Sequence, residues 1–151
     1  KQNGLYEEVG IKASEARLSY PQALSLAVDG SLFIADTGNH RLRKVTAVDG
    51  VLSSEGLITT LYNNQILSAP RGMDFDTFGN LFVTSGDRVF VVLADSTGTI
   101  SGNNEILTIY GNQTSYPESV TRCLSDIKRV DDNTMMLIDA CHGLLMRLAH
   151  E

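Results

Sequence analysis

The sequence predicts an all-β protein made of about three antiparallel sheets that share one internal order. Three segments with the same local pattern recur along the chain, at Pro21–Asp36, Pro70–Ser85 and Leu124–Asp139. Each begins with a short strand-like stretch, continues through a polar turn and ends in an unbroken apolar run. Apolar residues are nowhere sustained at helical spacing, so we expect strands and loops throughout.

The spacing of the three segments indicates blades of a β-propeller. Their last residues, Asp36, Ser85 and Asp139, are 49 and 54 positions apart, counted from 36 to 85 and from 85 to 139. Repeats near this length are typical of propeller blades. An unbroken apolar run of strand length implies burial on both faces, which a blade provides because it lies between two neighbours. The runs concerned are Leu32–Ala35, Leu81–Val83 and Met135–Ile138.

Two further strands complete the expected four-stranded blade. A third strand is predicted at Arg41–Val45, Arg88–Val92 and Leu144–Leu148, and a fourth at Leu57–Tyr62 and Ile106–Tyr110. Gly4–Tyr6 precedes Pro21 much as Thr60–Tyr62 precedes Pro70, which suggests the outer strand of a preceding blade. We therefore divide the chain into an outer strand at 1–20 and blades at 21–66, 67–120 and 121–151.

The stretch from Asp29 to Val45 resembles an NHL repeat, a family named for its Asn-His-Leu signature. Here Asn39-His40 is followed by Arg41 and then Leu42, so the third letter is displaced. The second copy lacks the signature residues, and the third keeps Asp139 and His142 with altered spacing. The resemblance implies a ring of about six blades, of which this chain would supply an incomplete part with two open edges. Either further blades are missing, or two half-rings complete each other, or the edges join copies into a polymer.

The signature residues are expected to stabilise turns rather than to perform chemistry. Asp36 and Asp139 end a strand, where a carboxylate can accept backbone N–H groups of the following turn. Asn39 and His40 follow Gly38 in a segment that suits a tight left-handed turn.

Two features favour a secreted or extracellular protein. Cys123 and Cys141 flank the first two strands of the third blade, and the ends of an antiparallel hairpin are close enough for a disulfide. The alternative is a pair of reduced cysteines in the core. Asn112-Gln113-Thr114 is an acceptor sequence for N-glycosylation in a polar loop. Disulfides persist in oxidising compartments, so the two features together predict secretion.

Charge and hydropathy argue against nucleic-acid and membrane partners. The chain has 12 Lys and Arg against 18 Asp and Glu, a formal net charge of −6, which repels phosphate backbones and anionic headgroups. The basic stretches, His40–Lys44 and Lys128–Arg129, are short. The longest apolar stretch, Val89–Ala94, is far below the roughly 20 residues that span a bilayer, and no basic-then-apolar leader opens the chain.

Catalytic, cofactor-binding and metal-binding residues are not predicted. His40, His142 and His150 have no ligand spacing, and a zinc site needs three or four convergent ligands. The acidic turns around Asp74-Asp76 and Asp131-Asp132 only partly fit a calcium loop. Gly-x-Ser-x-Gly, P-loop and dinucleotide fingerprints do not occur in the sequence.

Two functions are consistent with these features. The first is an extracellular, non-catalytic module that binds protein, including copies of itself, through its open blade edges. The second is part of a propeller enzyme, a lyase or hydrolase with a metal in the central channel. The second hypothesis rests on fold analogy alone.

Overall fold

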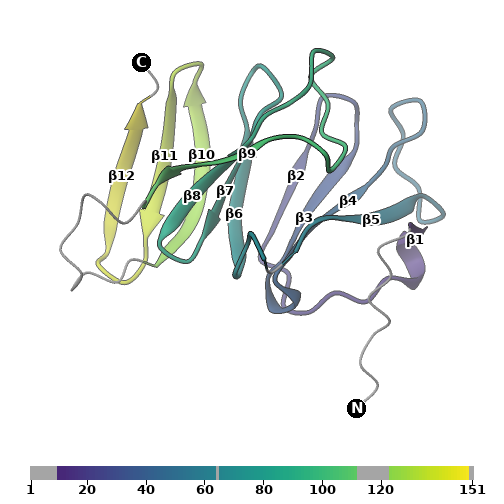
Figure 1. The fold of residues 1–151 in the computed structure, drawn as a ribbon, viewed down its shortest axis with the longest axis horizontal. Helices are drawn as coiled ribbons and strands as arrows, with labels where there is room; N and C mark the ends of the chain where they lie inside the picture. Colours follow the sequence, from purple (N-terminus) through teal and green to yellow (C-terminus); the bar gives the residue numbers. More distant parts are fainter. Residues whose placement is uncertain (1–9, 64, 112–122, 150–151) are drawn as a thin grey trace.

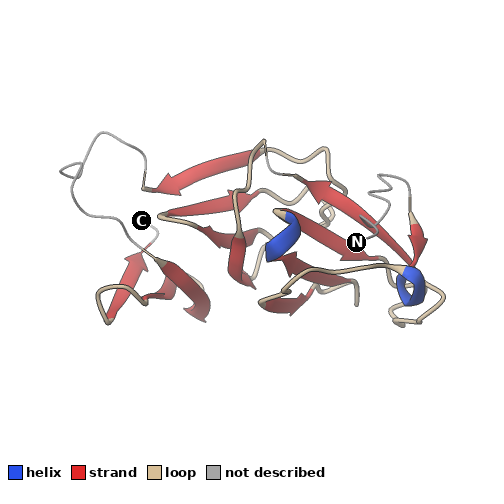
Figure 2. Cartoon of the chain, turned by 90° about the horizontal axis from the view of Figure 1, so that it is seen from below, coloured by secondary structure: helices blue, strands red, loops and turns tan. Residues whose placement is uncertain are grey.

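The computed structural model describes residues 10–63, 65–111 and 123–149 and places them in three antiparallel sheets arranged side by side (Figure 1). The strands are β1 (Ile11–Lys12), β2 (Ala23–Leu26), β3 (Leu32–Asp36), β4 (Arg41–Val45), β5 (Leu57–Tyr62), β6 (Pro70–Phe75), β7 (Leu81–Ser85), β8 (Arg88–Val92), β9 (Ile106–Tyr110), β10 (Leu124–Asp131), β11 (Thr134–Asp139) and β12 (Leu144–Ala149). Two 3-10 turns, η1 (Ala13–Glu15) and η2 (Thr37–Asn39), are the helical elements of this described part (Figure 2).

The prediction of an all-β fold with repeated antiparallel sheets is confirmed. The first sheet has the order β1-β5-β4-β3-β2, the second β6-β7-β8-β9 and the third β10-β11-β12, and the described residues do not close a ring. The short β1 pairs with β5 and so adds a fifth strand to the first sheet. Gly4–Tyr6, for which the sequence suggests an outer strand, lies outside the described residues.

Apolar side chains of alternate residues fill the space between the first and second sheets. Phe33, Ala35 and Leu42 face the second sheet and are almost fully buried against Met73 and Val83. Side chains in a strand alternate between its two faces, which explains why Phe33 and Ala35 share this core while Ile34 points the other way.

A second core lies between the second and third sheets. Phe82, Val89 and Val91 face Ile127 and Leu137 across the gap. In β7 every residue is buried, because this sheet has a neighbour on each face, as the unbroken apolar run predicts.

Strand β6, the first strand of the second sheet, contacts the first strand of each neighbouring sheet, β2 and β10. Lys128 donates from Nζ to the carbonyl of Met73 at 3.2 Å, and the Arg129 N–H donates to Asp74 Oδ2 at 2.9 Å. Gly72 has no Cβ, and a Cβ there would overlap the Cα of Asp126. The distance between the second and third sheets therefore depends on a glycine in β6.

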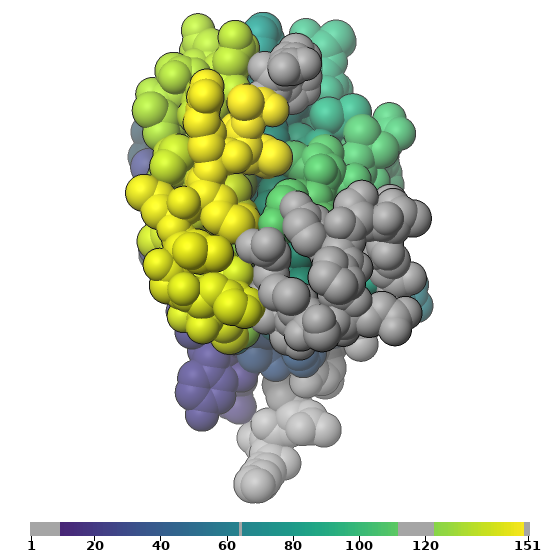
Figure 3. Space-filling view, turned by 90° about the vertical axis from the view of Figure 1, so that its left-hand side faces the viewer, coloured from purple at the N-terminus to yellow at the C-terminus, as the bar shows by residue number. Residues whose placement is uncertain are grey.

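The outer faces of the two terminal sheets remain partly open. Leu24 and Leu26 of β2 are 60% and 62% exposed, although residues from Ile11 to Ala16 cover another part of the same face. In the third sheet Ile138 is 43% and Leu145 69% exposed, and β12 forms the front of the surface in Figure 3. The expectation that Met135–Ile138 is buried on both faces is therefore wrong for Ile138, because no fourth sheet covers it in the described structure.

Replacing Gly72 by alanine should destabilise the protein by about 1–3 kcal/mol, the usual effect of forcing an extra carbon into a close backbone contact. Urea unfolding would measure this change, with Arg71→Ala as the control because Arg71 is the exposed neighbour in the same strand. Equal free energies of unfolding for the two variants would contradict the tight approach of the second and third sheets.

Candidate functional site

A buried carboxylate fixes the end of the second strand in the first sheet. Asp36, fully buried at the end of β3, accepts the backbone N–H of Ser19 at 2.7 Å and the side-chain amide of Asn39 at 2.8 Å. Nη1 of Arg43 lies 3.5 Å from Oδ2 of Asp36, the oxygen that also accepts from Asn39, and forms a buried ion pair with it. The carboxylate thus joins the chain before β2, the turn after β3 and strand β4.

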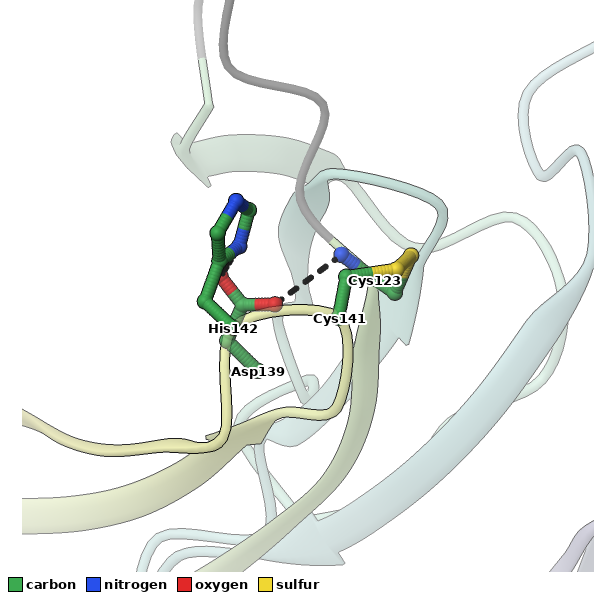
Figure 4. Close-up of a disulfide and its surroundings, with 4 residues drawn as sticks. All are labelled: Cys123, Asp139, Cys141 and His142. Carbon is green, nitrogen blue, oxygen red and sulfur yellow. Dashed lines mark hydrogen bonds and ion pairs between the residues drawn. A yellow bond between two sulfur atoms is a disulfide. The ribbon is translucent and has the colours of Figure 1, made fainter.

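The third sheet repeats this arrangement with different residues (Figure 4). Asp139 ends β11 and is fully buried, and its Oδ1 accepts the backbone N–H of Cys123 at 3.3 Å. Nδ1 of His142 lies 2.9 Å from Oδ2 of Asp139, so His142 takes the place that Asn39 has in the first sheet, three residues after the aspartate. A disulfide joins Cys123 and Cys141, whose Cα atoms are 5.3 Å apart.

In the second sheet a hydroxyl replaces the carboxylate. Ser85 ends β7, is 3% exposed and accepts the backbone N–H of Ser68 on Oγ at 3.1 Å. Asp36, Ser85 and Asp139, which we call the strand-end acceptors, therefore bind the same type of backbone group in all three sheets. Sequence reasoning missed Ser85, because a serine at a strand end carries no distinctive signal.

His40 contributes its backbone conformation to the turn. It has φ 54° and ψ 47°, in the left-handed region, at the end of η2. Gly143 has φ 63° at the corresponding position before β12. The third copy thus places glycine where the first has histidine, and its own histidine one residue earlier. That Asp36, Asn39 and His40 stabilise the turn rather than perform chemistry stays a prediction.

Opposing effects act on the ionisation of Asp139. Burial raises the pKa of its carboxyl, but hydrogen bonds from His142 and from the Cys123 N–H, together with the charge of His142, outweigh burial and leave the pKa lowered. The buried group is therefore ionised at neutral pH, where it is the better acceptor for both partners.

The opposite ends of the sheets carry the hairpin turns between first and second strands. Asp29, Asp76 and Asp131 each accept backbone N–H groups of their own turn. Hydrogen bonds from the Asn133 N–H and the Thr134 hydroxyl lower the pKa of Asp131. In residues 10–63, 65–111 and 123–149 no group of three or more His, Cys, Asp and Glu side chains could hold a metal ion.

Two cavities adjoin these hairpins. One of about 560 Å³ lies among the ends of β2 and β6, with Val28, Phe75 and Arg129 in its lining. The other, of about 290 Å³, lies between the second and third sheets over Phe82 and Met135. Both include Asp76 and Phe78 of the β6–β7 turn.

Two candidate residues of the sequence analysis cannot be placed. Asn112, the expected glycosylation site, and His150 lie outside the described residues. Among the residues that are described, no helix has the length and apolarity needed to cross a membrane.

Replacing Asp139 by asparagine should destabilise the protein at about pH 7 and much less at about pH 2. Because folding lowers the pKa of Asp139, its ionisation contributes fully above the ordinary carboxyl value of about 3.9 and the contribution disappears as the pH falls through the lower, folded-state pKa. Urea unfolding across this range, beside Asp132→Asn at an exposed carboxylate, measures the effect. A difference between wild type and Asp139→Asn that stays constant with pH would contradict it.

Comparison with known proteins bears on the fold. Residues 18–45 match the family model for the NHL repeat, and no curated protein sequence matches the chain. The similar solved structures include the following three. A luciferin-regenerating enzyme has a TM-score of 0.59 at 18% identity, covering 86% of this chain and 40% of its own. An inactive variant of virginiamycin B lyase from Staphylococcus aureus, solved with quinupristin, has a TM-score of 0.56 at 15% identity, covering 89% of this chain and 42% of its own. A gluconolactonase from Xanthomonas campestris has a TM-score of 0.56 at 21% identity, covering 89% of this chain and 39% of its own.

These similarities establish architecture and leave activity open. The chain spans about two fifths of the length of the three structures, and identities of 15–21% show a shared fold alone. The matched segment, 18–45, begins just before the Ser19 N–H bound by Asp36 and ends with β4. The first sheet therefore contains a segment that matches an NHL repeat, within an all-β fold of the β-propeller type.

Proposed function

We propose that this chain is an extracellular, non-catalytic module that binds protein, including copies of itself, through the open ends of its arc of sheets. The observation that carries the proposal is the exposed apolar surface on the outer faces of the first and third sheets. Leu24 and Leu26 of the first sheet and Leu145 of the third are 60%, 62% and 69% exposed.

The open side of the third sheet has the properties of a contact surface. An unpaired strand presents backbone N–H and C=O groups that can pair with another chain. Leu145 of β12 is 69% exposed and Ile138 of β11 43% exposed, and the two are cross-strand neighbours on the outer face. Covering such side chains is favourable because it removes apolar surface from water.

The opposite end of the arc offers a second apolar surface. Leu24 and Leu26 point to the face of the first sheet that lies away from the second sheet, since their neighbours Ile34 and Leu32 belong to the core on that face. A further sheet, from another copy or from another protein, would bury both leucines as the second sheet buries Phe33.

The extracellular location is supported by the disulfide between Cys123 and Cys141. It links the residue before β10 to the turn after β11, and Asp139 binds the Cys123 N–H beside it. Such bonds persist in oxidising compartments. The Asn112 acceptor sequence points the same way.

The alternative hypothesis is a propeller enzyme with a metal in the channel. Its support is the likeness to a lyase and a lactonase, which at 15–21% identity concerns the fold. Of the histidines considered for this role, His142 is engaged by Asp139. Stoichiometric divalent metal in the purified protein would favour this alternative.

Replacing Leu145 by glutamate should weaken self-association by about tenfold or more, because the contact would bury an unpaired charge. Light scattering coupled to size-exclusion chromatography over a range of concentrations measures the mass of the wild-type chain and of the variant. Leu107→Glu, at an exposed leucine of β9, is the matched control and should associate as the wild type does. A wild-type chain that remains monomeric at every concentration would contradict the proposed self-association.

Asn112 should carry an N-linked glycan in protein secreted from a eukaryotic host. Mass spectrometry before and after glycosidase treatment detects it, and Asn112→Gln should remove the mass difference. Unmodified Asn112 in a native secreted preparation would contradict this expectation.

A further inference from the structure

Phe78 is an apolar side chain held in an exposed position. It lies at the tip of the β6–β7 hairpin and is 70% exposed. The turn beneath it is fixed by Asp76, which accepts the backbone N–H groups of Phe78 and Asn80, both at 2.8 Å, and the side-chain amide of Asn80 at 2.7 Å. These bonds fix the conformation of the turn in which Phe78 is exposed.

Phe78 separates two hollows and lines both. On one side is the cavity of about 560 Å³, with Val28 across from the β6–β7 hairpin and 88% exposed. On the other side is the cavity of about 290 Å³, whose apolar lining comes from Phe82, Met135 and Leu148. We call the two cavities with Phe78 between them the hairpin-end groove.

The charges along the groove are mainly negative. Asp74 and Asp76 line the first cavity, and Asp76 and Asp132 the second. The cation that lines the groove, Arg129, lies 3.6 Å from Asp132 and also belongs to the first cavity. Because one of three carboxylates is paired in this way, the groove carries net negative charge beside its apolar surface.

We propose that the hairpin-end groove binds an extended segment of a protein partner in which a large apolar side chain stands next to a lysine or arginine. The apolar side chain enters the smaller cavity beside Phe78, over Phe82 and Met135. The neighbouring cation lies near Asp76, which lines both cavities, where opposite charge favours it. An apolar anchor in a pocket with a charged rim is a common arrangement in protein recognition. Acidic segments and nucleic acids are repelled by the same carboxylates.

This groove is a different surface from the open end of the arc at the third sheet. Phe78 and Asp76 belong to the hairpin turn of the second sheet, whereas Leu145 and Ile138 lie on the outer face of the third sheet. The two proposals therefore predict opposite effects for substitutions at Phe78 and at Leu145. A substitution at Phe78 should weaken peptide binding and leave self-association unchanged, and one at Leu145 should do the reverse, so either proposal can fail without the other.

The test uses fluorescein-labelled peptides of about ten residues and fluorescence anisotropy. The probe alternates lysine with leucine and phenylalanine, one control peptide has glutamate for every lysine, and a second has serine for every apolar residue. We expect the probe to bind at least about tenfold more tightly than either control, and more weakly as salt is raised to about 0.5 M.

The variants locate the binding. Phe78→Ser should weaken binding of the probe by about tenfold or more, and Asp132→Asn by a smaller factor, while Leu145→Ser should bind as the wild type does. Phe78→Ser should leave the self-association mass unchanged. Thermal unfolding confirms that each variant is folded, which is expected because Phe78 and Leu145 are largely exposed. Equal binding of the basic and acidic peptides, or unchanged binding by folded Phe78→Ser, would overturn the proposal, as would a probe that does not bind at all.

Discussion

The arrangement of this chain depends on one buried side-chain acceptor at the end of the second strand of each sheet. Asp36, Ser85 and Asp139 each bind the backbone N–H of a residue 16 or 17 positions earlier, just before the first strand. A hydrogen bond of this kind contributes about 0.5–3 kcal/mol, with the larger values for charged acceptors such as Asp36 and Asp139, so the acceptor helps to fix where the chain enters the sheet. With that point fixed, the first strand pairs in register with the second, and the next sheet can stack on the apolar face that results.

Each sheet buries one apolar face against the next sheet, so the first and last sheets of the described structure keep one apolar face exposed. The second sheet has neighbours on both sides and buries every residue of β7. The outer sheets bury one face and leave Leu24 or Leu145 in water. The hairpin ends are exposed for another reason, since turns cannot pair in the ladder and lie at the rim, where Phe78 is left between two cavities. The contact surfaces proposed for the arc ends and for the groove are thus separate consequences of one architecture.

The sequence predicts the strands well because their signals are local. The run Leu81–Val83 between polar turns contains the information for β7, and Asp36 with Asn39 marks a turn through residue types that favour it. What the sequence could not predict depends on packing between sheets. Ser85 is recognisable as an acceptor only once Ser68 lies against it, and the groove beside Phe78 exists only where three sheets meet at their hairpins. The exposure of Ile138 likewise depends on whether a further sheet is present.

Amide hydrogen exchange at Ser19, Ser68 and Cys123 tests the central claim most directly. If the strand-end acceptors hold the three chain segments, these amides exchange slowly, although all three precede their strands, and Ser85→Ala accelerates exchange at Ser68 while Ser19 stays protected. Exchange at all three as fast as at an unstructured amide would show that the acceptors do not hold these segments, and the shared geometry of the three sheets would need another cause.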